Sequence, residues 1–371
     1  MSVADRLRYA RERTGLTGSQ VRERTEIGES SLSDFENAKR EPSLSQLRRL
    51  ARVYRRPLSF FLSDDLIPEP AMVMWRERPE EFGEIEARFI QWCEQYHNLE
   101  IWTGEKAHFD LPAVTCSYDE FQYREAEDLA RQVGRYLALG ERPGRTLLTV
   151  LEEVCGVKIF HDAFEPTGTA ACAKSESFGG GILLNSGNPR WRRNHDLAHE
   201  LFHLLTWPIF HSAPASGVLQ PSDQEERLAT CFAANLLMPG DTFRSAIECR
   251  SDNGKIDYLD LYDVAREFDV SIESVIWRIH FVYNWGPAKS DETKTLIEKV
   301  KSYASQYEDR KEESEPDRFP DRYRALAVKA LRRGEISVGK FAEYLEVTRQ
   351  RALTYMGEEG ADIEEIAYSS S

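Results

Sequence analysis

The chain lacks the patterns that mark a secreted or membrane-bound protein. None of its six cysteines forms a CxxC pair, and a chain of 371 residues needs no disulfide bonds to stay folded. They are therefore predicted to be reduced thiols in a cytosolic protein. The N-terminus is charged and has no apolar signal-peptide core. No stretch approaches the ~20 uninterrupted apolar residues of a membrane span, so we expect a cytoplasmic protein with no membrane contact.

Excess positive charge is also absent from the chain as a whole. The formal net charge of −15 argues against a molecule that binds nucleic acid over its whole surface. Residues 1–60 nevertheless carry 13 Lys+Arg against 8 Asp+Glu, a net +5, which leaves −20 for the rest. Only this N-terminal segment is expected to meet a polyanion. Hydrophobic residues make up 41%, enough to build real cores in two or three domains.

Periodicity and breaks in the chain predict an α+β protein that is mostly helical. Strand patterns are confined to about 156–160 and 167–184, and the segments 63–85 and 308–320 have the composition of linkers. No long internal repeat is evident. The predicted parts are an all-α head (1–66), a linker and helical connector (67–123), a domain with a short sheet (124–250), a helical subdomain (251–307), and a C-terminal helix pair with a disordered tail (318–371).

The sequence NHDLAHELFHLL contains a metal-binding pattern. His199 and His203 are four residues apart, which puts both imidazoles on one face of a helix, one turn apart. Two imidazoles so placed can bind one Zn²⁺. Glu200 follows the first histidine and can reach a metal-bound water as general base. A catalytic zinc keeps three protein ligands and one open position, so a third ligand is needed.

The next predicted helix, QEERLATCFAANLLMP, offers two candidates for that ligand. Glu226 lies three residues before Ala229 and seven before Ala233, on the face that small residues allow to pack closely. We therefore favour Glu226, although the spacing leaves Glu225 open.

An ordinary amphipathic face is the alternative interpretation of the motif. The flanking residues are strongly apolar, however, so the helix is expected to be buried, and burying two histidines and a carboxylate without a partner is costly. A metal removes that cost. Four neighbouring polar residues are expected to be structural: His195, Asp196, His211 and Asp223.

These motifs resemble the ImmA/IrrE metallopeptidases. The matching features are Asn185 at a strand end, Arg192, the run AHELFH, and the LLMP that ends at Pro239. The resemblance implies Glu200 as catalyst and the metal ligands His199, His203 and Glu226. It also implies cleavage of a repressor protein, in stress response, mobile-element transfer or phage defence. The chain departs from the usual pattern at His195-Asp196 and at Thr230. Zn²⁺ is the expected metal, with Mn²⁺ as an alternative.

Residues 1–62 resemble XRE/Cro-type helix-turn-helix domains. In such folds the second helix of the motif enters the major groove and presents its N-terminal residues to base edges. The predicted DNA contacts are Gln20, Arg24, Glu29, Ser30, Ser31, Ser33, Lys39 and Arg40. This helix carries three carboxylates and no cation, so docking of a protein substrate by the head is a second interpretation.

The sequence therefore predicts a zinc-dependent endopeptidase, whose zincin-like peptidase domain spans residues 124–250, with an attached DNA-binding helix-turn-helix head at residues 1–66. Its expected partners are DNA and a protein substrate, namely a helix-turn-helix repressor, with a homodimer as one option for assembly. The alternatives are a transcription regulator with a structural zinc site, or a toxin–antitoxin component. The C-terminal helix pair, with Arg332-Arg333 and the run 348–351 (TRQR), fits either a second small helix-turn-helix or domain packing.

Overall fold

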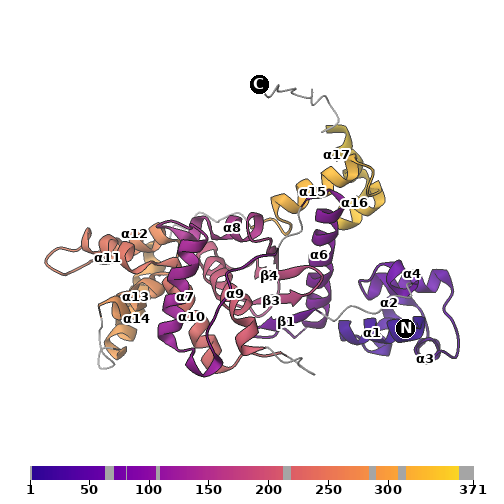
Figure 1. Cartoon of the computed structure of the whole chain (residues 1–371), viewed down its shortest axis with the longest axis horizontal. Helices are drawn as coiled ribbons and strands as arrows, with labels where there is room; N and C mark the ends of the chain where they lie inside the picture. The colour runs from indigo at the N-terminus through magenta and orange to yellow at the C-terminus, as the bar shows by residue number, and fades with distance from the viewer. Residues whose placement is uncertain are drawn as a thin grey trace.

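The computed structural model describes residues 2–62, 71–80, 82–105, 109–211, 219–283, 290–307 and 315–358. Helices predominate and surround one four-stranded sheet (Figure 1), so the predicted α+β, mostly helical class is confirmed. Within these ranges, no helix has the length and apolar character needed to span a bilayer.

Short, well-capped helices build the N-terminal head (residues 2–62). The side chains of Ser2, Thr17 and Ser43 each accept a hydrogen bond from a backbone N–H in the first turn of the following helix. Each cap is a capping box, which explains why these short helices begin where they do. The helices are α1 (Val3–Thr14), α2 (Gly18–Thr25), α3 (Glu29–Glu36), α4 (Leu44–Val53) and α5 (Leu58–Leu62).

The sheet has the strand order β1-β3-β4-β2. β2 runs parallel to β4, and the other two pairings are antiparallel. The sequence predicts a linker over residues 63–85, and this is wrong for β1, which pairs with β3 at the sheet edge. The strands are β1 (Met72–Trp75), β2 (Lys158–Asp162), β3 (Ala170–Ser175) and β4 (Gly179–Asn185).

The two faces of the sheet support two different cores. Alternate residues of a strand point to opposite faces. Ala170 and Cys172 of β3 accordingly join the core that contains α9 (Arg190–Phe210), whereas Ala171 and Ala173 join the core that contains α6 (Phe82–Trp102). The other helices of the peptidase-like body are η1 (Tyr118–Glu120), α7 (Tyr123–Tyr136), η2 (Pro143–Arg145), α8 (Leu147–Glu153), α10 (Asp223–Leu237), α11 (Gly240–Glu248), α12 (Tyr258–Phe268), α13 (Ile272–Val282) and α14 (Ser290–Tyr307).

The C-terminal part packs on α6 and shares its core. The sequence predicts a helix pair, but the structure has three helices: α15 (Asp321–Arg332), α16 (Val338–Tyr344) and α17 (Arg349–Glu358). Of the predicted linker at 308–320, residues 308–314 lie outside the described ranges. Phe319 is buried and Arg318 pairs with Asp162, so this end of the segment is packed rather than solvated. The predicted disordered tail, from residue 359 on, is also outside the described residues.

A buried ionic network fastens α15 to the sheet. The carboxylate of Glu100 on α6 lies 3.1 Å from the Lys158 ammonium of β2 and 2.6 Å from the Arg322 guanidinium of α15. Lys158 and Glu100 are almost completely buried, so each charge depends on the other. The C-terminal helices are thereby held in one position relative to α6.

The head contacts the same long helix near its other end (Figure 1). Gly83 in the first turn of α6 faces the backbone of α1: a Cβ at this position would lie 2.6 Å from the carbonyl oxygen of Thr14. Arg56 pairs with Glu94 at 2.6 Å, and Arg24 pairs with Glu84. Backbone contact and ion pairs together fix the head to α6.

Gly83→Ala is expected to loosen the head. Since the methyl group meets backbone atoms that cannot swing aside, overpacking should cost about 1–3 kcal/mol. Limited proteolysis should release a head fragment faster from this variant than from wild type. Gly134→Ala in α7 is the control, because its methyl group would make only an ordinary contact, 3.7 Å from Leu236. Equal cleavage rates in all three proteins would contradict the docking described.

Stability should fall in acid through His161 on β2. Burial, aided by the nearby Arg193, lowers the pKa of His161 to about 4. The unfolded chain binds a proton near pH 6.5 but the folded chain does not, so the free energy of unfolding should fall as pH drops from about 6.5 to 4, by roughly 3 kcal/mol at most. His161→Gln cannot take up that proton. Urea unfolding between pH 4 and 7 should show a flatter profile for the variant; an unchanged profile would contradict the assignment.

Candidate metal centre

The helix α9 places the H-E-x-x-H residues in the interior, as predicted. His199, Glu200 and His203 are each 1% exposed. The ring centroids of the two histidines are 5.0 Å apart, because residues four apart are neighbours on a helix face. The apolar residues that flank them pack against the sheet and against α10. The polar face of α9 is therefore enclosed rather than exposed to solvent.

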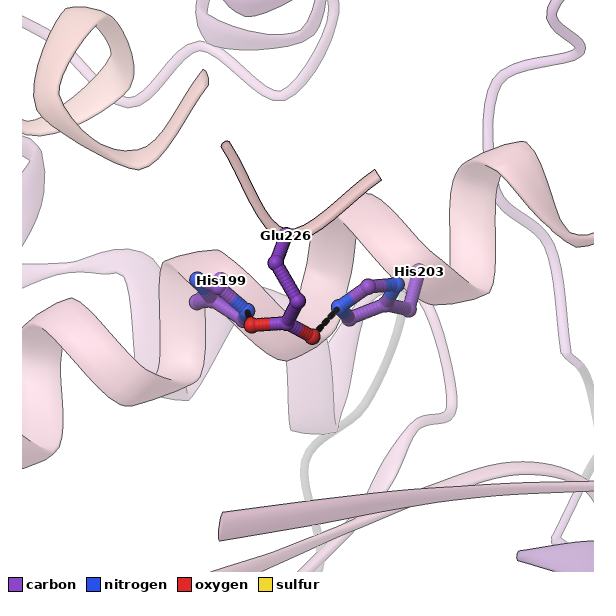
Figure 2. A group of neighbouring side chains, drawn as sticks. All are labelled: His199, His203 and Glu226. Atoms are coloured by element: carbon purple, nitrogen blue, oxygen red, sulfur yellow. Dashed lines mark ion pairs between the residues drawn. The ribbon is translucent and has the colours of Figure 1, made fainter. Parts of the chain in front are cut away.

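Glu226 on α10 completes the cluster (Figure 2). Its carboxylate lies between the two imidazoles, with Oε2 3.2 Å from His199 Nε2 and Oε1 3.4 Å from His203 Nε2. Three potential ligand atoms, one from each residue, all lie within 4.8 Å of one another. α10 approaches closely here because Ala229 and Ala233 are fully buried against the neighbouring helices.

The donor set fits a divalent metal. Within the described residues, both Nε2 atoms and Glu226 Oε1 are buried without a hydrogen-bond partner. Such groups are costly to bury unless something satisfies them. Two imidazole nitrogens and one carboxylate oxygen are the ligands of many catalytic zinc sites.

Glu225 has a different place in this centre. It is 2% exposed, and its Oε1 accepts hydrogen bonds from His203 Nδ1 at 2.9 Å and from His211 Nε2 at 3.0 Å. Of the two carboxylates that the sequence leaves open, the structure brings Glu226 to the Nε2 atoms and Glu225 to the opposite side of the His203 ring. A carboxylate on Nδ1 fixes the tautomer that leaves Nε2 available for a metal.

The electrostatics follow from burial and from these contacts. Burial raises the pKa of Glu200 to about 7 and lowers that of His199 to about 4. Burial also opposes the charge on His203, but its hydrogen bond with Glu225 and the nearby carboxylate of Glu226 outweigh burial and raise its pKa to about 10. In the metal-free centre a proton on His203 balances the carboxylates. A divalent cation can take over that role, with release of the proton.

Cys172 on β3 is a neighbour of Glu200 that the sequence does not reveal. Its thiol, fully buried, shares a hydrogen bond with the Glu200 carboxylate. Arg76, just after β1, lies 3.5 Å from Glu226 and is also not indicated by the motif. Cys172 and Arg76 lie outside the two motif helices, so no helical spacing could indicate them. Asp196, which the sequence predicts to be structural, pairs with Arg192 and accepts a hydrogen bond from Asn188.

The predicted DNA contacts all lie on the head, and all of them except the partly exposed Ser31 are exposed. Glu29, Ser30, Ser33, Lys39 and Arg40 are exposed in and after α3, and Ser31 is partly exposed. Gln20 accepts the backbone N–H of Thr17 as the α2 cap. Arg24 is held by Glu84 of α6. The structure thus leaves α3 accessible and gives Gln20 and Arg24 other contacts.

Comparison with known proteins identifies the class of two parts of the chain. Residues 2–59 match the model of a helix-turn-helix domain, and residues 152–280 match the peptidase-M78 model, described as the IrrE N-terminal-like domain. The chain therefore combines an N-terminal helix-turn-helix domain with an IrrE-like, metallopeptidase-like domain. The ImmA/IrrE resemblance seen in the sequence is thereby confirmed over these residues.

One curated relative and one solved structure are similar to this chain to different extents. The HTH-type transcriptional regulator ImmR of Bacillus subtilis (strain 168) is 32% identical over 65 residues, 18% of this chain. The match spans about half (51%) of that relative's length. Among solved structures, Bacillus thuringiensis PlcR in complex with the peptide PapR7 and DNA aligns over 97% of this chain and 95% of its own, at 12% identity. Its TM-score of 0.17 carries no inference about this protein.

Glu225→Gln is expected to weaken metal binding without removing a ligand. The amide no longer holds His203 Nδ1 and His211 together as the carboxylate does, and loss of such support typically costs about 10–100-fold in metal affinity. Titration of the metal-free protein with zinc against a chromogenic chelator measures this. Asp223→Asn, an exposed charge change in the same helical turn, should bind zinc as wild type does. Equal affinities for Glu225→Gln and wild type would remove Glu225 from the centre.

Proposed function

We propose that this protein is a zinc-dependent endopeptidase that cleaves a protein substrate, a cognate helix-turn-helix repressor, and that its N-terminal head binds DNA. One observation carries the proposal: His199, His203 and Glu226 converge within 4.8 Å, and Glu200 lies on the same helix as the two histidines. The resemblance of residues 152–280 to the IrrE-like domain supports the same chemistry.

His199, His203 and Glu226 would hold the metal. A divalent cation at this centre supplies a Lewis acid that polarises the scissile carbonyl and acidifies the attacking water. Zn²⁺ suits the nitrogen and oxygen donors, and Mn²⁺ is the alternative. A purely structural metal would have no use for a further carboxylate that is not a ligand, and Glu200 supplies one.

Glu200 is the proposed general base. It takes a proton from water as the water attacks, then gives that proton to the leaving amine, so the carboxylate is regenerated in each cycle. Burial raises its pKa to about 7, which suits a group that both accepts and donates a proton near neutral pH. The Cys172 thiol, in hydrogen-bonding contact, keeps the carboxylate directed at one position.

The head supplies the regulatory part of the proposal. Its exposed α3 and its net positive charge fit the phosphate backbone and bases of duplex DNA. ImmR, to which 65 residues of this chain are 32% identical, is itself an HTH-type transcriptional regulator. Cleaving a repressor while binding DNA would join both activities in the control of gene expression, for which stress response and phage defence are the proposed settings.

Glu200→Gln should separate metal binding from catalysis. The variant is expected to retain a stoichiometric metal by mass spectrometry, because no ligand is changed, and to cleave at least about 100-fold more slowly. The substrate in this assay is a purified helix-turn-helix repressor, the class of protein that the proposal names. His199→Ala, as a matched variant one residue away, should lose both metal and cleavage. Wild-type cleavage by Glu200→Gln, or a wild-type protein without metal, would overturn the proposal.

A further inference from the structure

Helices α15, α16 and α17 repeat the arrangement of the first three helices of the head. We call residues 321–358 the C-terminal unit. Adding 320 to the residue numbers of α2 and α3 gives the starts of α16 and α17: Gly18 corresponds to Val338, and Glu29 to Arg349. No long repeat is evident in the sequence because few aligned residues are identical. The repeat lies in the positions of caps, turns and buried residues.

The capping and turn geometry is the same in both copies. The backbone N–H of Gln20 donates to the Thr17 hydroxyl, and that of Lys340 donates to the Ser337 hydroxyl. The turn that follows begins at Glu26 in the head and at Glu346 in the C-terminal unit, with φ of 58° and 52° respectively. A glutamate rarely adopts this left-handed conformation, so its occurrence at equivalent positions is informative.

The second helix of each pair also begins in the same way. Leu32 N–H donates to the carbonyl of Gly28, and Ala352 N–H donates to the carbonyl of Thr348, four residues back in both cases. Each pair of helices is therefore joined by the short turn that characterises a helix-turn-helix.

Several buried positions agree between the two copies. The equivalent residues Ala10 and Ala330, Leu16 and Ile336, and Val21 and Phe341 are all buried, as are Leu32 and Ala352. Burial differs elsewhere, since Ala342 and Tyr344 are buried where the head has the exposed Arg22 and Arg24. In both copies the first helix, α1 or α15, also contacts α6. The C-terminal unit thus shares with the head a helix-turn-helix pair preceded by a helix that packs on α6.

The two copies differ in what the second helix presents to solvent. Glu29, Ser30 and Ser31 begin α3 in the head, and the equivalent residues of α17 are Arg349, Gln350 and Arg351, all exposed. Arginine pairs with guanine, and glutamine with adenine, through two hydrogen bonds in the major groove. These chemical groups stand at the N-terminal end of the helix, where recognition helices contact base edges.

We propose that α17 is the recognition helix of a second helix-turn-helix domain in this chain and that it binds duplex DNA, with Arg349, Gln350 and Arg351 reading bases. Lys340, equivalent to Gln20 of the head and exposed to an intermediate degree, lies where it can meet a phosphate. The charge of this surface is complementary to DNA, whereas α3 begins with a carboxylate. The protein then contacts DNA through two units carried by α6, a helix about 30 Å long.

The test is selection of bound DNA by the full-length protein. Random duplexes of roughly 30 base pairs can hold two half-sites one helical turn apart. Bound duplexes are sequenced for wild type and for the double variant Arg349→Ala/Arg351→Ala. Wild type should select two separate conserved blocks. The double variant should lose one block and bind the wild-type sequence at least tenfold more weakly, because each lost arginine–guanine pair is worth about a factor of five or more.

Controls separate this result from loss of folding or of general charge. Arg131→Ala on α7 removes one exposed positive charge far from both units and should select the same two blocks as wild type. Gln350→Ala should alter preference within the affected block only, with an unchanged melting temperature. A single block, unchanged in the double variant, would overturn the proposal. So would wild-type affinity of the double variant for the selected DNA.

Discussion

The pairing of α9 with α10 is the contact on which the rest of this protein depends. It encloses two imidazoles and the carboxylates of Glu200 and Glu225 almost entirely away from water, with the partly buried carboxylate of Glu226 beside them. Unpaired, each buried charge would cost several kcal/mol. The hydrogen bonds of Glu225 to His203 and His211 offset part of this cost, and a bound cation would offset the remainder. The burial of these charged groups thus determines both the stability of the centre and its ability to bind a cation.

The sheet and α6 connect the metal centre to the other parts of the chain. One face of β3 supplies Cys172 to the neighbourhood of Glu200, and the opposite face packs on α6. α6 in turn contacts the head near Gly83 and the C-terminal unit near Glu100. A substrate bound at the metal centre and DNA bound at the helical units would therefore act on elements that are connected through the sheet and α6.

Local patterns predicted much of the structure. The helix of His199 and His203, the buried helix of Glu226 and the capped helices of the head all follow from periodicity and short-range capping, which a sequence displays directly. The sequence does not indicate β1, because its partner β3 lies about 100 residues away and its four residues show no alternation of apolar and polar side chains. The role of Glu225 could not be separated from that of Glu226, because adjacent helical residues differ only in the direction they point.

Long-range relationships had to come from the structure. Arg76 and Cys172 reach the centre from strands that no spacing rule links to α9. Arg24, a predicted phosphate contact, pairs with Glu84, which lies 60 residues away in the sequence. The similarity of the head to the C-terminal unit lies in hydrogen bonds, backbone angles and burial. Few aligned residues are identical, so the sequence alone does not reveal it.

X-ray absorption at the zinc edge tests the central claim most directly. The full-length protein, purified with its metal, should give a first shell of nitrogen and oxygen only, with the outer-shell scattering of two imidazoles and distances near 2.0–2.1 Å. His203→Ala should lose one imidazole from that spectrum. A sulfur shell near 2.3 Å would place the metal on cysteine, and a spectrum without imidazole would place it elsewhere. Either result would contradict a metal centre built from α9 and α10.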